Sequence, residues 1–259
     1  MSKIIQTDCV VGLNNLAANS VEVIVTSPPY NIGIKYNEHN DSRMDYLPWM
    51  RSVFVACKRT LKPNGHFFLQ MGGTSIRPLI PQEVLSEALT AGFFLQNEIL
   101  WVKNISIGEK SFGQFKPINS ERFLNHTHEF IFHLTKTGGV KINRLATGVP
   151  FEYKSNIKRF TGKTHRCRGN VWFIPYDTIQ TKEERYYHPA TFPIALPEMC
   201  IRLSGAEKGA CVVDPFAGSG TTLVACDRLK MNGIGFEISS EYCKVIKKRL
   251  KAERSLGIC

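Results

Sequence analysis

The stretch VVDPFAGSGTT, residues 212–222, joins an apolar strand to a helix through an acidic residue and a glycine-rich turn. Such a turn brings bare backbone and a helix N-terminus close to a ligand. No lysine lies between Gly220 and the threonine pair, although a P-loop for nucleoside triphosphates requires one. Leu223 stands where the dinucleotide fingerprint has its third glycine. The stretch therefore predicts an α/β fold with a ligand-binding turn that matches neither motif.

The segments around this turn alternate between strand-like and helix-like patterns. Strands are expected at residues 3–8, 21–26, 66–71, 93–103, 128–136, 210–214 and 232–238. Helices are expected at residues 9–20, 45–61, 81–92, 221–230 and 239–254, and KPNG at 62–65 indicates a helix stop and a turn. This alternation predicts an α/β fold with a doubly wound, mostly parallel sheet. One such domain is ordinary for 259 residues.

A second stretch, VIVTSPPYN at residues 23–31, also ends an apolar strand abruptly. Pro28 and Pro29 cannot donate ladder hydrogen bonds, so the strand must stop there. The segment is either a rigid strand-end turn or a site that presents Ser27 and Tyr30. Glu237 ends the strand after the glycine-rich turn, near where such folds place an acid for ribose hydroxyls. A solvated strand-end glutamate is the alternative.

Together these segments resemble the amino-group DNA methyltransferases that use S-adenosylmethionine. Ser27-Pro28-Pro29-Tyr30 resembles the catalytic motif of that family, and residues 214–222 resemble its methyl-donor loop. Residues 188–203 resemble the segment that lines the methionine end of the donor. The catalytic motif comes first and the donor loop last, which is the order of the β group. The resemblance covers most of the chain except residues 136–187.

The resemblance implies a class I methyltransferase (Rossmann-like) fold with a circularly permuted motif order and a basic target-recognition insert. Residues 1–135 would form the catalytic half, 136–187 the target-recognition region and 188–259 the S-adenosylmethionine-binding half. The donor-loop strand and the tetrapeptide strand would then be neighbours at the topological switch point, where ligands bind. The long sequence distance between Ser27 and Gly218 is therefore no objection.

The same resemblance assigns residues to sites. The catalytic set is Ser27, Pro28, Pro29 and Tyr30. The cofactor set, for S-adenosylmethionine, is Asp8, Cys9, His188, Pro189, Phe192, Asp214, Phe216, Ala217, Gly218, Ser219, Gly220, Thr221, Thr222 and Glu237. Asp8 and Cys9 would lie against the adenine, but Asp8 equally fits a helix N-cap. Asp8, Asp214 and Glu237 are the acids that could favour a sulfonium charge.

Methyl transfer to a base amino group explains the residue types in the tetrapeptide. The amino lone pair is delocalised into the ring, so a catalyst must accept its N–H bonds and align it with the methyl group. Ser27 Oγ and the Pro28 carbonyl are the two expected acceptors, and Tyr30 offers a stacking face to a flipped base. Ser27 replaces the commoner aspartate, and in the family a serine here is associated with N4 of cytosine. N6 of adenine is the alternative, because some members with serine modify adenine.

The net charge of +11 favours a polyanionic partner, and double-stranded DNA is expected. Basic and aromatic residues interleave in residues 136–187, where we expect DNA contacts. The candidates there are Lys158, Arg159, Lys163, Arg166 and Arg168. An ordinary basic surface insertion is the alternative. The polar loop 31–45 either moves over the target base or is static. The basic residues of the last helix, Arg249 among them, are expected on a solvated face.

The cysteines and the apolar stretches bear on the location of the protein and on its partners. The eight cysteines form no C-x-x-C pair, so we expect reduced cysteines in a cytoplasmic protein without a metal site. No membrane partner is expected, since no apolar stretch has the length of a span. A monomer or homodimer is expected, and a companion restriction endonuclease fits the habits of the family. A non-catalytic DNA-binding relative, which would bind DNA without the methyl donor, is the competing hypothesis.

Overall fold

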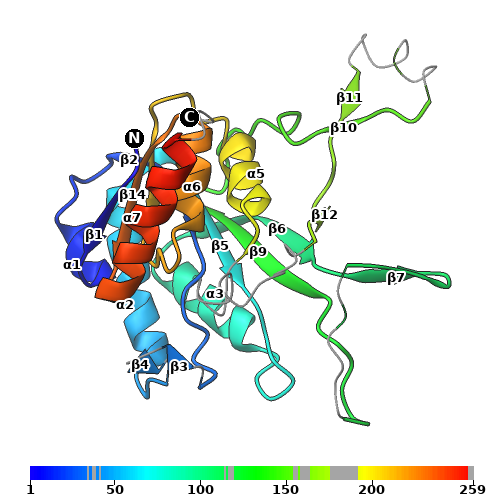
Figure 1. The fold of residues 1–259 in the computed structure, drawn as a ribbon, viewed down its shortest axis with the longest axis horizontal. Helices are drawn as coiled ribbons and strands as arrows, with labels where there is room; N and C mark the ends of the chain where they lie inside the picture. Colours follow the sequence, from blue (N-terminus) through cyan, green and yellow to red (C-terminus); the bar gives the residue numbers. More distant parts are fainter. Residues whose placement is uncertain are drawn as a thin grey trace.

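An eight-stranded sheet with helices on both faces forms the body of the protein (Figure 1). The computed structural model describes all of residues 1–259 except 34, 37–38, 41, 114, 116–119, 154–156, 158–163, 176–191 and 256–259. The strands of the sheet are β1 (Lys3–Gln6), β2 (Val21–Thr26), β5 (Leu61–Met71), β6 (Phe94–Val102), β9 (His128–Thr135), β12 (Val171–Phe173), β13 (Cys211–Asp214) and β14 (Asn232–Glu237). The helices are α1 (Cys9–Asn14), α2 (Tyr46–Thr60), α3 (Ile80–Thr90), α5 (Ala195–Ser204), α6 (Thr221–Arg228) and α7 (Ser240–Ser255).

The strand order is β1-β14-β13-β2-β5-β9-β6-β12. Neighbouring strands are parallel except for β9, which runs antiparallel to both β5 and β6. The first and last parts of the chain meet in the middle of this sheet, where Val212 of β13 pairs with Val23 of β2. The mostly parallel, doubly wound sheet is therefore confirmed, and so is the predicted adjacency of the donor-loop strand and the tetrapeptide strand.

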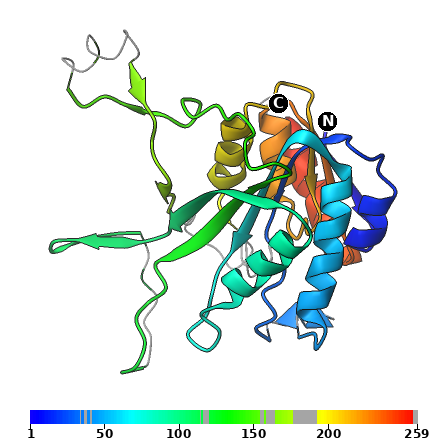
Figure 2. The same ribbon diagram turned by 180° about the vertical axis from the view of Figure 1, so that it is seen from behind.

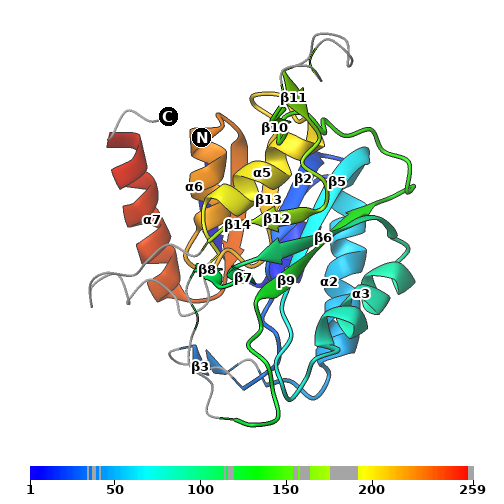
Figure 3. The same cartoon turned by 90° about the vertical axis from the view of Figure 1, so that its right-hand side faces the viewer.

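Alternating residues of the strands feed two separate cores. Ile24 and Phe67 pack on the face covered by α1, α2 and α3, whereas Val23 and Phe68 pack on the face that α5 and α6 cover. Helix α7 packs against α6 through Ile246 and Leu250. Figures 2 and 3 show the two helical layers with the sheet between them. Because both faces are buried, the central strands are apolar throughout, as parallel strands require.

Outside the main sheet, the described residues form three short ribbons. They are β3–β4 (Lys35–Tyr36 and His39–Asn40), β7–β8 (Ile105–Ile107 and Lys110–Phe112) and β10–β11 (Val149–Pro150 and His165–Arg166). The ribbons β7–β8 and β10–β11 extend beyond the β6–β12 end of the sheet, away from α1 and α7 (Figure 1). These two irregular extensions therefore share one edge of the sheet.

The structure differs from the sequence-based expectation at KPNG, at α5 and at β12. KPNG, predicted as a turn, lies within β5 as a bulge, because the pairing with β2 passes from Val21–Leu61 directly to Val23–His66. The second difference is α5, which we did not predict; it tolerates Pro197 in its first turn and ends at Gly205, whose φ is 74°. In addition, β12 lies inside the predicted insert 136–187, yet it pairs with β6 and buries Trp172.

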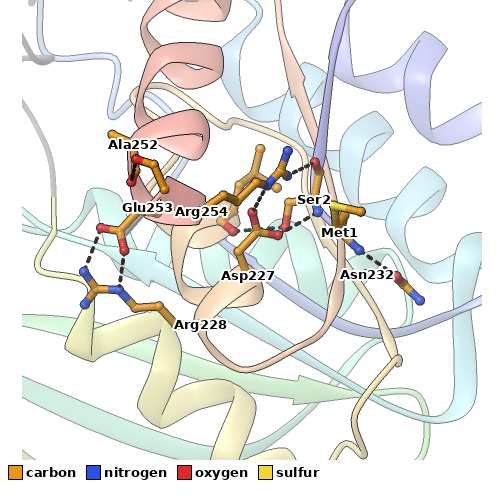
Figure 4. A network of polar contacts seen from close by, with 10 residues as sticks. Met1, Ser2, Asp227, Arg228, Asn232, Ala252, Glu253 and Arg254 are labelled. Carbon is orange, nitrogen blue, oxygen red and sulfur yellow. Dashed lines mark hydrogen bonds and ion pairs between the residues drawn. The ribbon is translucent and has the colours of Figure 1, made fainter. Parts of the chain in front are cut away.

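The N-terminal strand and the last helix are held together by a buried polar network (Figure 4). Asp227 of α6 accepts the backbone N–H of Ser2 at 2.7 Å and the Nε of Arg254 at 2.8 Å. Arg254 also donates to the Ser2 carbonyl at 2.7 Å, and Arg228 forms a two-bond ion pair with Glu253. Asp227 is only 4% exposed, so its charge is matched inside the protein. The network fixes α7 beside β1 and α6.

Candidate active site

The tetrapeptide Ser27-Pro28-Pro29-Tyr30 follows the carboxyl end of β2, as predicted. Pro28 is buried, and the other three residues are half-buried. The Tyr46 hydroxyl, at the start of α2, donates to the Pro29 carbonyl at 2.6 Å. This bond, together with the fixed φ of the two prolines, holds the backbone of the tetrapeptide in one direction.

The Tyr30 hydroxyl is the centre of a polar network beside Ser27. Ser27 Oγ lies 3.3 Å from the Tyr30 hydroxyl, which donates toward Gln70 Oε1 at 3.0 Å and Glu129 Oε2 at 3.1 Å. Gln70 Nε2 donates to Glu129, and Lys103 forms an ion pair with the second oxygen of that carboxylate at 2.6 Å. Sequence reasoning missed Gln70, Glu129 and Lys103.

The location of these three residues follows from the strand directions. Gln70 is the last but one residue of β5, Glu129 is the second residue of the antiparallel β9, and Lys103 follows β6. The end of a strand and the start of its antiparallel neighbour meet at the same edge of a sheet. A glutamine and a glutamate inside otherwise apolar strands were the available signal, because buried polar groups need partners.

The donor loop begins with Asp214, which is 2% exposed. Its Oδ1 accepts the Thr26 hydroxyl at 2.6 Å and the Phe216 N–H at 3.1 Å. Burial raises the pKa of Asp214 to about 6, although the hydrogen bonds from Thr26 and Thr222 act in the opposite direction. Asp214 therefore joins the donor loop to the residue directly before the tetrapeptide. Its buried carboxylate links the two motifs, and its expected place beside the sulfonium of the donor stays a prediction.

The glycines and Glu237 shape the rest of the loop. Gly218 and Gly220 have φ values of 51° and 82°, which favour glycine. The Gly218 N–H donates to Glu237 Oε2 at 2.9 Å, and the Ser239 N–H donates to Glu237 Oε1 at 2.8 Å. Ala217 N–H donates to the Phe236 carbonyl at 2.9 Å. Glu237 thus lies against the donor loop with a fixed carboxylate, and contact with a ribose stays a prediction.

Arg249 of α7 contacts the donor loop from behind. Its Nη1 donates to the Ser219 carbonyl at 2.6 Å, to Ser219 Oγ at 3.0 Å and to Thr221 Oγ1 at 3.4 Å. The expectation of a solvated side chain was wrong for this residue. The spacing of the basic residues along the helix did not distinguish Arg249 from its neighbours. Only the packing of α7 on α6 shows that Arg249 lies on the face toward the donor loop. Lys244, Lys247, Lys248 and Lys251 are exposed, as expected.

Asp8 and Cys9 lie at the start of α1, at the carboxyl end of β1. Asp8 Oδ1 accepts the N–H groups of Val10 and Val11 at 2.8 and 3.1 Å, so it caps the helix. Cys9 is buried, and burial together with the nearby Asp8 charge raises its thiol pKa to about 12. The Cys9 thiol is therefore neutral and packs in the core as a small apolar side chain. The adenine contact proposed for both residues stays a prediction.

An aromatic pair lies between α2 and the donor loop. Trp49 meets Phe216 edge to face, with ring centroids 5.6 Å apart. The Arg43 guanidinium lies 4.7 Å from the centre of the Trp49 ring. Trp49 was not predicted as a site residue. The pair supplies an apolar wall between the first residues of the donor loop and α2.

The remaining predicted site residues make local contacts or fall outside the described residues. Phe192 is half-buried and packs against the core cluster that includes Leu196 and Cys200 of α5, and its contact with the donor stays a prediction. Arg166 is exposed on β11, and the Arg168 guanidinium donates to the Thr147 carbonyl at 3.0 Å. His188, Pro189, Lys158, Arg159 and Lys163 fall outside the described residues.

The chemistry of the described residues fits S-adenosylmethionine. Asp8 follows β1, Glu237 is the last residue of β14 and the donor loop follows β13. These strands are adjacent, so carboxylates, glycine backbone and aromatic rings gather at one end of the sheet. Acids suit ribose hydroxyls and a sulfonium, and apolar rings suit adenine. Glu237, the donor-loop backbone, Trp49 and Phe216 would hold the group. No cluster of metal-binding side chains occurs among the described residues, and no helix there is long and apolar enough to cross a membrane.

The fold and the site together define a class I methyltransferase with a permuted order of motifs. A family model described as DNA methylase, of the N6/N4 type, matches residues 21–248. The chain belongs to this family. Membership confirms the predicted activity class, a DNA methyltransferase, and the predicted methyl donor, S-adenosylmethionine.

Relatives and solved structures agree with this assignment. The Type II methyltransferase M.HpaI of Haemophilus parainfluenzae is 31% identical over 97% of this chain and 74% of its own length. M.BglII of Bacillus subtilis is 30% identical over 98% of this chain and 70% of its own. The PvuII cytosine-N4-specific DNA methyltransferase superposes with a TM-score of 0.74 at 22% identity, over 96% of this chain and 86% of that chain. A DNA modification methylase of Thermus thermophilus, in complex with S-adenosyl-L-methionine, gives 0.66 at 23% identity over 98% and 94%. These likenesses confirm the predicted fold.

Proposed function

We propose that the protein transfers a methyl group from S-adenosylmethionine to N4 of cytosine within a specific sequence of double-stranded DNA. The observation that carries the proposal is the direct link between the two motifs. Thr26, one residue before Ser27, bonds to Asp214 at the start of the donor loop, 2.6 Å away. Acceptors for a base amino group and the loop for a methyl donor are thereby held at one place in the sheet.

The tetrapeptide can prepare an amino group for attack. Ser27 Oγ and the Pro28 carbonyl accept its two N–H bonds, which makes the nitrogen more pyramidal and its lone pair more available. The backbone bond from Tyr46 to Pro29 and the proline rings fix these acceptors before the base arrives. Little orientational freedom then remains to be lost on binding.

The residues on the donor side of the site hold S-adenosylmethionine and align its methyl group with the base. S-adenosylmethionine supplies an electrophilic methyl group on a positively charged sulfur. Glu237 and the backbone of Gly218 are fixed to each other, and Arg249 fixes Ser219 from the other side. Trp49 and Phe216 supply an apolar wall on the side of α2. The target base must leave the duplex to reach this edge of the sheet.

Cytosine is preferred because residue 27 is serine. A neutral hydroxyl accepts one bond without adding a charge, and serine at this position is associated with N4 transfer in the family. The fold is shared with a protein that is cytosine-N4-specific. N6 of adenine is the alternative substrate. The names of M.HpaI and M.BglII support a role as the modification enzyme of a Type II restriction system, with a companion endonuclease.

DNA contacts are proposed for the extensions at the β6–β12 end of the sheet. Arg166 is exposed on β11, and this ribbon extends away from the body (Figure 1). Lysine and arginine side chains on such extensions neutralise phosphates, which supplies most of the non-specific affinity for DNA.

The test is a product analysis. Mixed-sequence DNA is incubated with the protein and S-adenosylmethionine, digested to nucleosides and analysed by mass spectrometry. N4-methyl-2′-deoxycytidine is expected, and Ser27→Ala should abolish it while donor binding, measured by calorimetry, persists. N6-methyl-2′-deoxyadenosine would establish the alternative. Heat of DNA binding without donor binding or any methylated nucleoside would support a non-catalytic DNA-binding protein.

A further inference from the structure

A serine hydroxyl at position 27 faces a problem that an aspartate does not have. A hydroxyl is both a donor and an acceptor, and its proton rotates to suit its surroundings. An amino group of a base brings only N–H bonds toward Ser27. The Ser27 proton must therefore point elsewhere if its oxygen is to accept from that amino group.

The network around Tyr30 settles where that proton goes. The Tyr30 hydroxyl faces Gln70 Oε1 at 3.0 Å and Glu129 Oε2 at 3.1 Å, and both of these atoms are acceptors. The amide of Gln70 has its orientation fixed, because its nitrogen donates to the same carboxylate. The single Tyr30 proton is accordingly directed at Gln70 and Glu129.

The direction of the Tyr30 hydrogen bond also sets the direction of the bond between Tyr30 and Ser27. Because the Tyr30 proton points away from Ser27, the Tyr30 oxygen meets Ser27 Oγ, 3.3 Å away, as an acceptor. The Ser27 hydroxyl donates to it. The lone pairs of Ser27 Oγ are then directed away from its own proton and toward an incoming N–H.

Glu129 is the residue that sets this direction. Its carboxylate is an acceptor only, and its side chain is 14% exposed beside Lys103, whose side chain is 13% exposed. Lys103 balances the charge at 2.6 Å on the oxygen that does not face Tyr30. Gly72 leaves the space for it, since a Cβ at position 72 would lie 2.7 Å from the Glu129 carboxyl carbon.

We propose that Glu129 is a positioning residue for the methyl transfer: through the Tyr30 hydroxyl it orients the Ser27 hydroxyl as an acceptor for the amino group of the target base. Lys103 and Gln70 hold Glu129 in that role. The proposal rests on the proposed function of Ser27. It also gives a physical reason why serine can stand where the commoner form of the motif has aspartate.

The first experiment is Glu129→Gln, with Glu98→Gln as the matched control. Glu98 is exposed on β6, the strand next to β9, and its loss removes the same charge. A glutamine at 129 presents donors as well as an acceptor, so the direction of the chain of hydrogen bonds is lost. We expect kcat to fall about 10- to 100-fold, the effect of one hydrogen bond to a charged group. The KM for DNA and the Kd for S-adenosylmethionine should stay unchanged, and Glu98→Gln should leave kcat unchanged.

A second experiment separates orientation of the hydroxyl from support of the fold. Tyr30→Phe keeps the ring but removes the relay, so Glu129→Gln should cost little more when added to Tyr30→Phe. In a Ser27→Asp background, where no hydroxyl needs orienting, Glu129→Gln should also cost far less than in the wild type. Losses that multiply in the Tyr30→Phe background would mean that Glu129 only supports the fold. That result would overturn the proposal.

The outcomes distinguish a failure of the proposed function from a failure of the proposed role of Glu129. No methylated nucleoside from the wild-type protein would end the proposed function itself. Loss of activity in Ser27→Ala with full kcat in Glu129→Gln would keep the proposed function and overturn the role of Glu129. A fall in the thermal midpoint of Glu129→Gln together with weakened donor binding would also overturn it, because the damage would then be structural.

Discussion

Arg249 lies in the last helix, and its Nη1 donates to the carbonyl of Ser219 in the donor loop at 2.6 Å. A loop with two residues at positive φ has few backbone partners of its own, so an external donor that satisfies its carbonyl limits its motion. The last helix is therefore part of the support of the donor site, although its own sequence reads as a basic surface helix.

Arg249→Ala should weaken the binding of S-adenosylmethionine. The carbonyl and hydroxyl of Ser219 lose their partner, and the loop gains freedom that binding must remove. We expect Kd to rise about tenfold, equal to about 1.4 kcal/mol. Calorimetric titration of the donor measures this, with exposed Lys248→Ala on the same helix as control. Equal affinities for the two variants would contradict the bracing role.

Thr26→Val should destabilise the protein, and more so at higher pH. The hydroxyl of Thr26 donates to Asp214, whose pKa burial raises to about 6, so the bond is strongest when the carboxylate is charged above that pH. The expected loss is about 1–3 kcal/mol at pH 8 and less at pH 5. Urea unfolding at both pH values gives the numbers, and exposed Thr137→Val serves as control. A loss of unfolding free energy that does not change with pH would show that the charge of Asp214 does not strengthen its hydrogen bond with Thr26.

The buried pair His66 and His133 should lower stability on acidification. His66 Nδ1 lies 2.9 Å from His133 Nε2; burial lowers the pKa of His66 to about 4, and burial with the neighbouring His66 charge lowers that of His133 to about 3. Below pH 6.5 both histidines bind a proton in the unfolded chain, whereas in the folded protein they stay neutral until the pH approaches their lowered pKa values. Asp214, whose pKa is raised, binds one proton more when folded and opposes this between pH 3.8 and 6.

The net slope between pH 6 and 4 corresponds to about one proton, or about 1.4 kcal/mol of stability lost per pH unit. Urea unfolding across this range measures it. Nuclear magnetic resonance at about pH 5.5, between the lowered and the ordinary histidine pKa values, should show both imidazoles neutral. Protonated rings at that pH in the folded protein would refute the assignment.

Arg166→Ala should weaken DNA binding if β10–β11 contacts phosphates. The loss should be similar for all sequences, and the slope of log affinity against log salt should fall by about one. Fluorescence anisotropy at several salt concentrations measures both quantities. Lys3→Ala, exposed on the opposite edge strand β1, removes the same charge and should change neither. An unchanged slope in Arg166→Ala would place the DNA elsewhere.

The strands and the two motifs could be predicted from the sequence because they depend on local signals, whereas the adjacency of the donor-loop strand and the tetrapeptide strand was implied by the resemblance to the methyltransferase family. Apolar runs, prolines and glycines act within a few residues, and the α/β alternation restricts the topology. KPNG shows the limit of such signals: its turn chemistry is real, but the pairing of β5 with β2 continues past it as a bulge.

The residues that the sequence did not reveal act through contacts made only in the folded protein. Glu129, Lys103 and Arg249 carry charges that look solvated in a linear pattern, and each meets its partner from another element. Asp8 is the converse case. Its N-cap bonds follow from local sequence, whereas its contact with a ligand depends on what β1 and β14 bring together.

The contact between Ser2 and Arg254 has a consequence for how this enzyme could be rebuilt. The first strand and the last helix already touch, through bonds that Asp227 completes. A short linker from residue 254 back to residue 2, combined with a new opening at a surface loop on the other side of the sheet, would permute this part of the chain. The two motifs would exchange their order along the gene while keeping their places in space. The chemistry of the site therefore depends on where the two motifs lie in the sheet and is independent of their order along the chain.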